Sequence, residues 1–102
     1  MIRTFTPLEN ETYNSYIQRI IDNRGRERSS NPNEYQEKHH ILPKCLGGQD
    51  EENNLIYLYA QEHYYAHKLL ALENPHHSGL QCAWWNMCHI QRKDIINITA
   101  EE

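Results

Sequence analysis

The chain has 102 residues, of which 38% are hydrophobic, and its formal net charge is −4. We expect one compact domain over residues 1–102, because this length leaves no room for a second domain of ordinary size. No apolar run approaches the ~20 residues that cross a bilayer, and the first residues lack the apolar stretch of a secretion signal. These features predict a cytoplasmic protein that does not contact membranes.

The first predicted element is an amphipathic helix over residues 7–23. Thr6 and Glu9 have the spacing of a capping box, and Pro7 suits the first helical position. Gly25 is a natural end for this helix. Apolar residues recur at helical spacing at Tyr13, Tyr16, Ile17, Ile20 and Ile21.

A polar segment, residues 24–36, is predicted to follow this helix as a loop. It carries Arg24, Arg26 and Arg28. The segment is either an ordinary solvated surface or an arm that contacts phosphate groups. The sequence favours the first interpretation and leaves the second open.

Two short strands come next, over residues 37–42 and 55–58. The first strand contains the pair His39-His40, and Pro43 follows it. The segment between the strands has two adjacent glycines and a polar run, which predicts a loop.

The last predicted elements are two helices, over residues 61–72 and 79–91. The first carries His63 and His67 on one side, since residues four apart share a face. Ser78 can cap the second helix. A helix, a hairpin and two further helices make an α+β fold.

The cysteines, Cys45, Cys82 and Cys88, are odd in number and form no Cys-x-x-Cys pair. This argues against a disulfide framework and against a cysteine zinc knuckle. We therefore expect reduced thiols.

The two histidine pairs suggest hydrolytic chemistry. A hairpin that runs into a helix can bring His39-His40 and His63/His67 to one point. Hydrolysis of a phosphodiester needs a group that takes a proton from water, and a divalent ion that neutralises charge on the phosphate. Because adjacent strand residues point to opposite faces, one histidine of the pair could bind the ion while the other faces the water.

The order of these residues resembles a known family. Residues 38–70 are similar to the HNH (ββα-metal) endonucleases, particularly the small phage-encoded enzymes of the homing type. The matching residues are His39-His40-Ile41 with Pro43, Leu46-Gly47-Gly48, Asn54-Leu55, Glu62-His63 and Ala66-His67-Lys68-Leu69-Leu70.

The resemblance implies a ββα-metal finger that the N-terminal and C-terminal helices flank. It implies that His40 is the general base, that His39 and His63 bind one divalent ion, and that His67 is a third ligand. Asn54 would orient His40 through its backbone carbonyl. The ion would be Mg²⁺, Mn²⁺, Ni²⁺ or Zn²⁺, and histidine ligands favour the transition metals.

The resemblance also implies double-stranded DNA as the partner, and leaves open a homodimer or a partner protein. The charge of −4 is unusual for a free-standing nucleic-acid binder, so a local basic surface would be needed. The candidate contacts to the DNA backbone are Arg24, Arg26, Arg28, Lys38, Lys44 and Lys68.

The chain departs from the family at three points. Tyr59 stands where phage members often have a threonine that caps the metal-binding helix. The paired cysteines of a structural zinc and a further DNA-binding module are also missing. Two alternatives therefore remain, which are a catalytically silent module with a structural zinc and a nuclease subunit of a larger phage complex. His76, His77 and His89 are expected to be surface residues.

Overall fold

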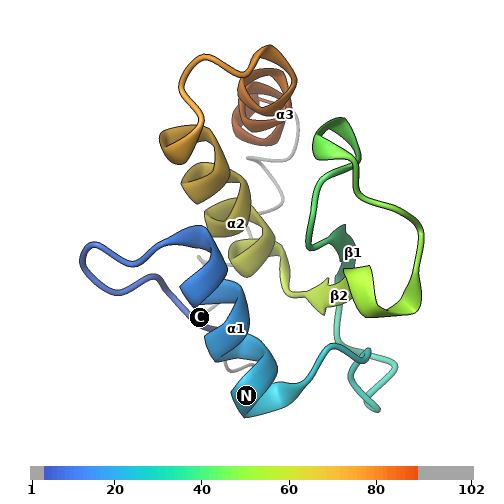
Figure 1. The fold of residues 1–102 in the computed structure, drawn as a ribbon. Coiled ribbons are helices and arrows are strands. Elements are labelled where there is room, and N and C mark those ends of the chain that lie inside the picture. The colour runs from blue at the N-terminus through green and yellow to red at the C-terminus, as the bar shows by residue number, and fades with distance from the viewer. Residues whose placement is uncertain (1–3, 90–102) are drawn as a thin grey trace.

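The computed structural model describes residues 4–89. Three helices and one hairpin follow one another along the chain (Figure 1). These elements are α1 (Tyr13–Arg24), β1 (Glu37–His40), β2 (Leu55–Leu58), α2 (Ala60–Glu73) and α3 (Ser78–His89). Short 3-10 turns at Lys44–Leu46 and Glu52–Asn54 lie within the loop between the strands. The predicted α+β order is confirmed.

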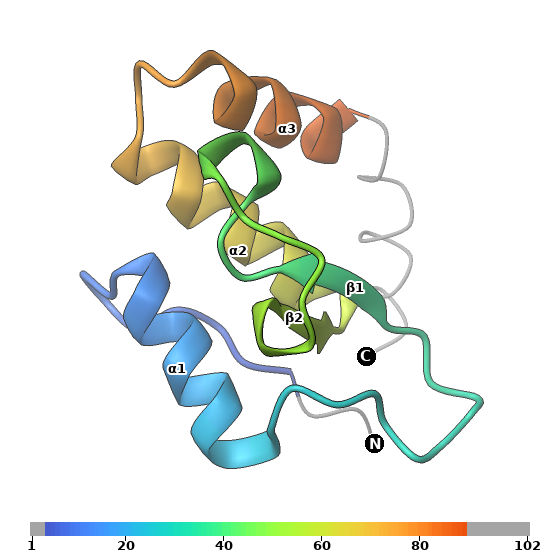
Figure 2. The ribbon, with the colours of Figure 1, turned by 45° about the vertical axis from the view of Figure 1, so that its right-hand side comes forward.

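Helix α2 occupies the centre of the fold. Helix α1, the hairpin and α3 all pack against it, and Figures 1 and 2 show them on different sides of α2. The core between them is apolar, because each element contributes the buried stripe that its pattern predicts. Its fully buried hydrophobic side chains include Tyr16, Ile20, Ile56, Leu58 and Leu80. No helix among residues 4–89 is long and apolar enough to cross a membrane.

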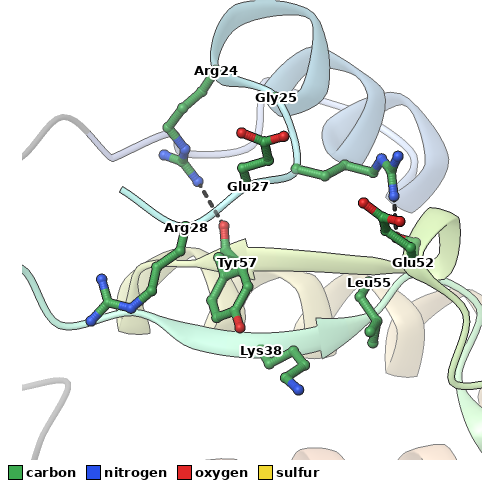
Figure 3. Close-up of a pocket in the computed structure, with 9 residues that line it drawn as sticks. Arg24, Gly25, Glu27, Arg28, Lys38, Glu52, Leu55 and Tyr57 are labelled. Atoms are coloured by element: carbon green, nitrogen blue, oxygen red, sulfur yellow. Dashed lines mark hydrogen bonds between the residues drawn. The ribbon is translucent and has the colours of Figure 1, made fainter. Parts of the chain in front are cut away.

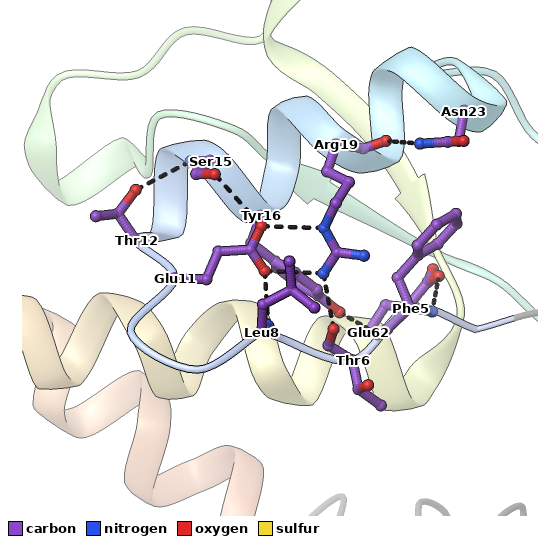
Figure 4. A network of polar contacts seen from close by, with 10 residues as sticks. All are labelled: Phe5, Thr6, Leu8, Glu11, Thr12, Ser15, Tyr16, Arg19, Asn23 and Glu62. Atoms are coloured by element: carbon purple, nitrogen blue, oxygen red, sulfur yellow. Dashed lines mark hydrogen bonds and ion pairs between the residues drawn. The ribbon is translucent and has the colours of Figure 1, made fainter.

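Helix α1 begins at Tyr13, so the prediction of a helix from residue 7 with Thr6 as its cap is wrong. The cap is Thr12, whose hydroxyl accepts a hydrogen bond from the Ser15 amide at 3.1 Å. Both threonines have capping potential, but the chain before Thr12 turns through Asn10, which has a positive φ of 62°. Arg19 holds this irregular segment against the helix by bonding Glu11 and the carbonyl of Thr6 (Figure 4).

The hairpin is antiparallel, and its register sets which residues face α2. His39 pairs with Ile56, and both are buried. Lys38 pairs with Tyr57 on the opposite, outer face, because successive strand residues alternate. Strand β1 ends at His40, two residues earlier than predicted, whereas β2 has the predicted bounds.

The helix caps differ from the predicted ones. The Tyr59 amide donates to Oε1 of Glu62 at 3.0 Å, so at the start of α2 a carboxylate bonds the amide of the capping residue, a different group from the helix amides that a threonine hydroxyl would bond. At α3 the cap is His77, whose Nδ1 accepts from the Leu80 amide at 3.2 Å. The prediction that Ser78 caps this helix is wrong, since Ser78 is already helical. The predicted end at residue 91 lies outside the described residues.

Candidate metal centre

Three histidines from two elements meet on the inner side of the hairpin. His39 comes from β1, while His63 and His67 are one turn apart on α2. One ring nitrogen from each lies within 4.8 Å of the others, and the group could hold a metal ion. The Nε2 atoms of His63 and His67 are 3.1 Å apart. Two imidazole ligands of a tetrahedral ion would be about 3.3 Å apart, so little rearrangement is needed.

Burial keeps two of the three histidines, His39 and His67, uncharged at neutral pH. It lowers the pKa of His39 well below 6.5, and the neighbouring His63 and His67 lower it further. Burial, with a contribution from His63, lowers the pKa of His67 to about 4. Both rings are therefore neutral at pH 7 and offer the lone pairs that a metal ion requires. Nδ1 of His67 is buried without a hydrogen-bond partner in the described part of the chain.

Two residues outside the predicted site contact these histidines. Oε1 of Glu37 accepts from Nδ1 of His63 at 2.8 Å, and this bond lowers the pKa of the Glu37 carboxyl. The hydroxyl of Tyr13 lies 2.7 Å from Nε2 of His39. Glu37 could have been found from the sequence, because it lies two residues before His39 on the same strand face. No sequence signal pointed to Tyr13, whose contact depends on how α1 docks.

His40 shares an open surface pocket with the three histidines. The pocket is lined by Lys38, His39, His40, Pro43, Lys44, His63 and His67. Nε2 of His40 lies 2.5 Å from Oδ1 of Asp50, and Nζ of Lys44 is 3.1 Å from Oδ2 of the same carboxylate. These contacts, the one with His40 most of all, lower the pKa of the Asp50 carboxyl. Asp50 was missed by sequence analysis, because the path of the loop decides where it lies.

Asn54 closes the loop that separates the strands. Its side chain accepts from the Leu42 amide at 2.8 Å and donates to the carbonyls of Leu42 and Gln49. Its own carbonyl accepts from the Ile41 amide at 2.8 Å. The bonds described for Asn54 thus hold the backbone just after His40 and do not involve the imidazole itself. Gly48 packs so closely here that a Cβ would come within 1.7 Å of the Leu42 carbonyl oxygen.

The predicted DNA-contacting cations are divided between several places. Arg24 is held inside the molecule by the buried Glu62, at 2.6 and 2.8 Å, which gives it a structural role. Arg26 donates to the Glu52 carbonyl, and Arg28 to the Glu34 carbonyl. Lys68 lines a different hollow, beside Thr6 and Leu72. The structure thus brings Lys38 and Lys44 to the histidine pocket, but not Arg24 or Lys68.

A second pocket adjoins the outer face of the hairpin (Figure 3). It has a volume of about 370 Å³, and its lining includes Arg26, Arg28 and Tyr57. Lys38 lines both this pocket and the histidine pocket. The amide of Tyr57 donates to the Arg26 carbonyl at 3.0 Å, so the arginine segment is fixed to β2.

Part of the chain is similar in sequence to several proteins of one bacteriophage. The chain is 52% identical over 54 residues to probable mobile endonuclease D of Enterobacteria phage T4, which covers 53% of this chain and 21% of that protein. It is 43% identical over 58 residues to probable mobile endonuclease E of the same phage, covering 57% of this chain and 40% of that protein. Half of the chain is homologous to phage mobile endonucleases.

Probable mobile endonuclease B of the same phage is 45% identical over 58 residues, which cover 57% of this chain and 21% of that protein. The chain thus spans less than half the length of these relatives. No family model matches the sequence, and no solved structure matches it.

Proposed function

We propose that the chain is a metal-dependent endonuclease of the HNH type, which hydrolyses phosphodiester bonds in double-stranded DNA. The observation that carries the proposal is a single pocket lined by four histidines in two different arrangements. Three of them could hold a metal ion, and a fourth, His40, is paired with a carboxylate. The similarity to proteins named as probable mobile endonucleases supports the same chemistry.

His39, His63 and His67 would hold the ion. A bound divalent cation would supply charge neutralisation at the phosphate and the leaving oxygen. Three imidazole ligands suit Zn²⁺ or Ni²⁺ better than Mg²⁺ or Mn²⁺, which prefer oxygen ligands. Glu37 would support the site by keeping the His63 ring in a fixed orientation.

His40 would act as the general base. The Asp50 carboxylate can only accept a hydrogen bond, so Nε2 of His40 carries the hydrogen and Nδ1 keeps the lone pair that takes a proton from water. Asp50 would then stabilise the imidazolium that forms. Asn54 would position His40 by fixing the backbone of Ile41 and Leu42.

The DNA backbone would run from the histidine pocket to the second pocket, past Lys38, which lines both. Lys38 and Lys44 line the histidine pocket, and Lys38 joins it to the pocket that Arg26 and Arg28 line. These cations would provide a local basic surface on a chain whose net charge is −4, with Glu27 and Glu52 as the acids in the lining of the second pocket. A second copy of the chain or a partner protein would extend the surface, as in a nuclease subunit of a larger assembly.

A second candidate function is a silent module in which the three histidines hold a structural zinc. The burial of His39, at 4% exposure, favours it, because structural ions are enclosed by protein. The open pocket beside the histidines and the presence of His40 favour the nuclease.

A plasmid-cleavage assay separates the two. Protein stripped of metal is supplied with Mg²⁺, Mn²⁺, Ni²⁺ or Zn²⁺, and the wild type is compared with His40→Ala. Loss of a general base should lower the rate by about 10²–10⁴-fold and leave metal affinity unchanged. His76→Ala is the matched control, since His76 is exposed and lies outside the pocket. If His40→Ala cleaves as fast as the wild type, His40 is not the general base. If the wild type binds metal but cleaves with none of the four ions, the chain is the silent module.

A further inference from the structure

The hydroxyl of Tyr13 lies between two groups of β1 and the loop that follows it. It is 2.7 Å from Nε2 of His39 and 2.6 Å from the carbonyl oxygen of Ile41. Tyr13 and His39 are each only 4% exposed, so water does not compete for these contacts. A phenol has one hydrogen and a carbonyl oxygen can only accept, so the hydroxyl must donate to Ile41. Toward His39 it can then only accept.

This hydrogen-bond direction fixes the state of the His39 ring. If the hydroxyl accepts from Nε2, the ring hydrogen is on Nε2 and the lone pair is on Nδ1. We infer that Tyr13 is a positioning residue that sets the tautomer of His39, so that a metal ion would be held by Nδ1 of His39 and by Nε2 of His63 and His67. The inference rests on the metal centre of the proposed function.

The hydrogen bonds of the other two rings, His63 and His67, indicate which of their nitrogens would bind the ion. Glu37 accepts from Nδ1 of His63, which leaves Nε2 of that ring as its ligand atom by the same reasoning. Nε2 of His67 lies 3.1 Å from that atom, whereas its Nδ1 has no partner in the described residues. Two of the three tautomers are therefore set before an ion arrives, one by a phenol and one by a carboxylate.

Tyr13 is itself held firmly. It is the first residue of α1, next to the Thr12 cap, and its amide donates to Oε2 of Glu73 at 2.6 Å. Glu73 is the last residue of α2, the helix that carries the other two ligands. The first residue of α1 is thus hydrogen-bonded to the end of α2 by its amide, while its hydroxyl contacts β1. This gives the N-terminal helix a part in the site that its apolar pattern did not indicate.

The test compares Tyr13→Phe with Tyr16→Phe. Both residues lie on α1, both are buried, and the hydroxyl of Tyr16 also donates to a backbone carbonyl, that of Phe5, at 2.6 Å. Each variant keeps the ring. Tyr16→Phe loses the bond to Phe5, whereas Tyr13→Phe loses the bond to Ile41 and the contact with His39, the candidate ligand. The dissociation constant for Zn²⁺ is measured by competition with a chromophoric chelator. Imidazole tautomers are read from ¹⁵N NMR with and without Zn²⁺.

We expect wild-type His39 to carry its hydrogen on Nε2 without metal, and Zn²⁺ to shift the Nδ1 resonance. Tyr13→Phe should populate both tautomers and bind Zn²⁺ about 10–100-fold more weakly, as is usual when a group that orients a metal-binding histidine is removed. Tyr16→Phe should bind as the wild type does, despite a similar loss of stability.

Three results would overturn the inference. They are a wild-type His39 with its hydrogen on Nδ1, a Zn²⁺-induced shift at Nε2, and equal Zn²⁺ affinities for the two variants. Failure of the proposed function has a different signature, in which the wild type binds no ion although its His39 tautomer is the expected one. That outcome would also remove the ligand assignment, but it would leave Tyr13 as the residue that sets the tautomer.

Discussion

Helix α2 carries two polar clusters on different sides of its first turns, and consecutive residues, Glu62 and His63, belong to them. Glu62 faces α1 and the N-terminal segment, whereas His63 faces β1. Both clusters are largely buried, yet their hydrogen bonding differs. The Glu62 carboxylate is 0% exposed and accepts from four donors, namely the amides of Phe5 and Tyr59 and both Nη atoms of Arg24.

The histidine cluster is incompletely bonded. Burial lowers the pKa of His39 and of His67, Nε2 of His63 and Nε2 of His67 lie 3.1 Å apart, and Nδ1 of His67 has no hydrogen-bond partner in the described residues. A buried acceptor whose donors are all present stabilises one arrangement, whereas ring nitrogens that converge with one of them unsatisfied leave the arrangement open to a cation. The comparison separates a group that holds the fold from one that is suited to a ligand, although both are buried, polar and on the same helix.

The largest expected effect is on the Glu62 cluster. Arg24→Met should lower the free energy of unfolding by about 3–5 kcal/mol, because it leaves a buried carboxylate without its partner. Urea denaturation measures this. Lys44→Met is the control, since the Lys44–Asp50 pair is exposed at 62% and 66% and should contribute at most about 1 kcal/mol. Similar losses for the two variants would show that the Glu62 cluster is not a structural centre.

The next effect concerns the histidine cluster and pH. The folded protein keeps His67 neutral down to about pH 4, whereas the unfolded chain takes up the proton near pH 6.5. The stability of metal-free protein should therefore be complete above pH 6.5 and fall as the pH drops toward 4, by about 3 kcal/mol for His67. His39 acts in the same direction.

Urea denaturation of metal-free protein between pH 7 and pH 4 measures this loss. His67→Phe, which fills similar space without a titrating group, should flatten the dependence by about the same 3 kcal/mol. Subtracting the variant's curve from that of the wild type removes the contribution of carboxylates. Parallel curves would show that burial does not keep His67 neutral.

The smallest expected effect is on DNA binding at the surface around Lys38, beside the histidine cluster. Lys38→Gln should weaken DNA binding about equally for all sequences and reduce the dependence of log affinity on log salt by about 1, the change for one lost phosphate contact. Fluorescence anisotropy of metal-free protein with a labelled duplex measures both. Lys68→Gln should leave the salt dependence unchanged, because Lys68 lines a different hollow. If Lys38→Gln and Lys68→Gln change the salt dependence equally, the DNA does not bind beside the histidine pocket.

Local periodicity explains what the sequence could predict. The helical repeat placed His63 and His67 on one face, and strand alternation separated His39 from His40, so the three histidines of the candidate centre were found. The bounds of β2 followed from its short apolar run. Whether these residues perform the proposed roles stays a prediction.

What the sequence could not supply depends on docking between distant segments. Thr6 and Thr12 both suit a helix cap, and only the contacts of the N-terminal segment with Arg19 show which one is used. The contact of Tyr13 with His39 needs α1 to lie against β1, and Asp50 reaches His40 only through the closed loop. Arg24 looked like a phosphate contact because its partner, Glu62, is far away in the chain.

The alternation of the hairpin has a consequence for insertions and deletions. His39 and His40 differ only in which face of β1 they occupy, and the bonds of Asn54 to Ile41 and Leu42 fix that choice. Insertion of one residue between His40 and Ile41 would turn every side chain of β1 to the opposite face, so His40 would take the buried position of His39 and His39 would turn outward. The site should therefore tolerate many substitutions in the loop, but no change in the distance between the histidine pair and the residues that Asn54 holds.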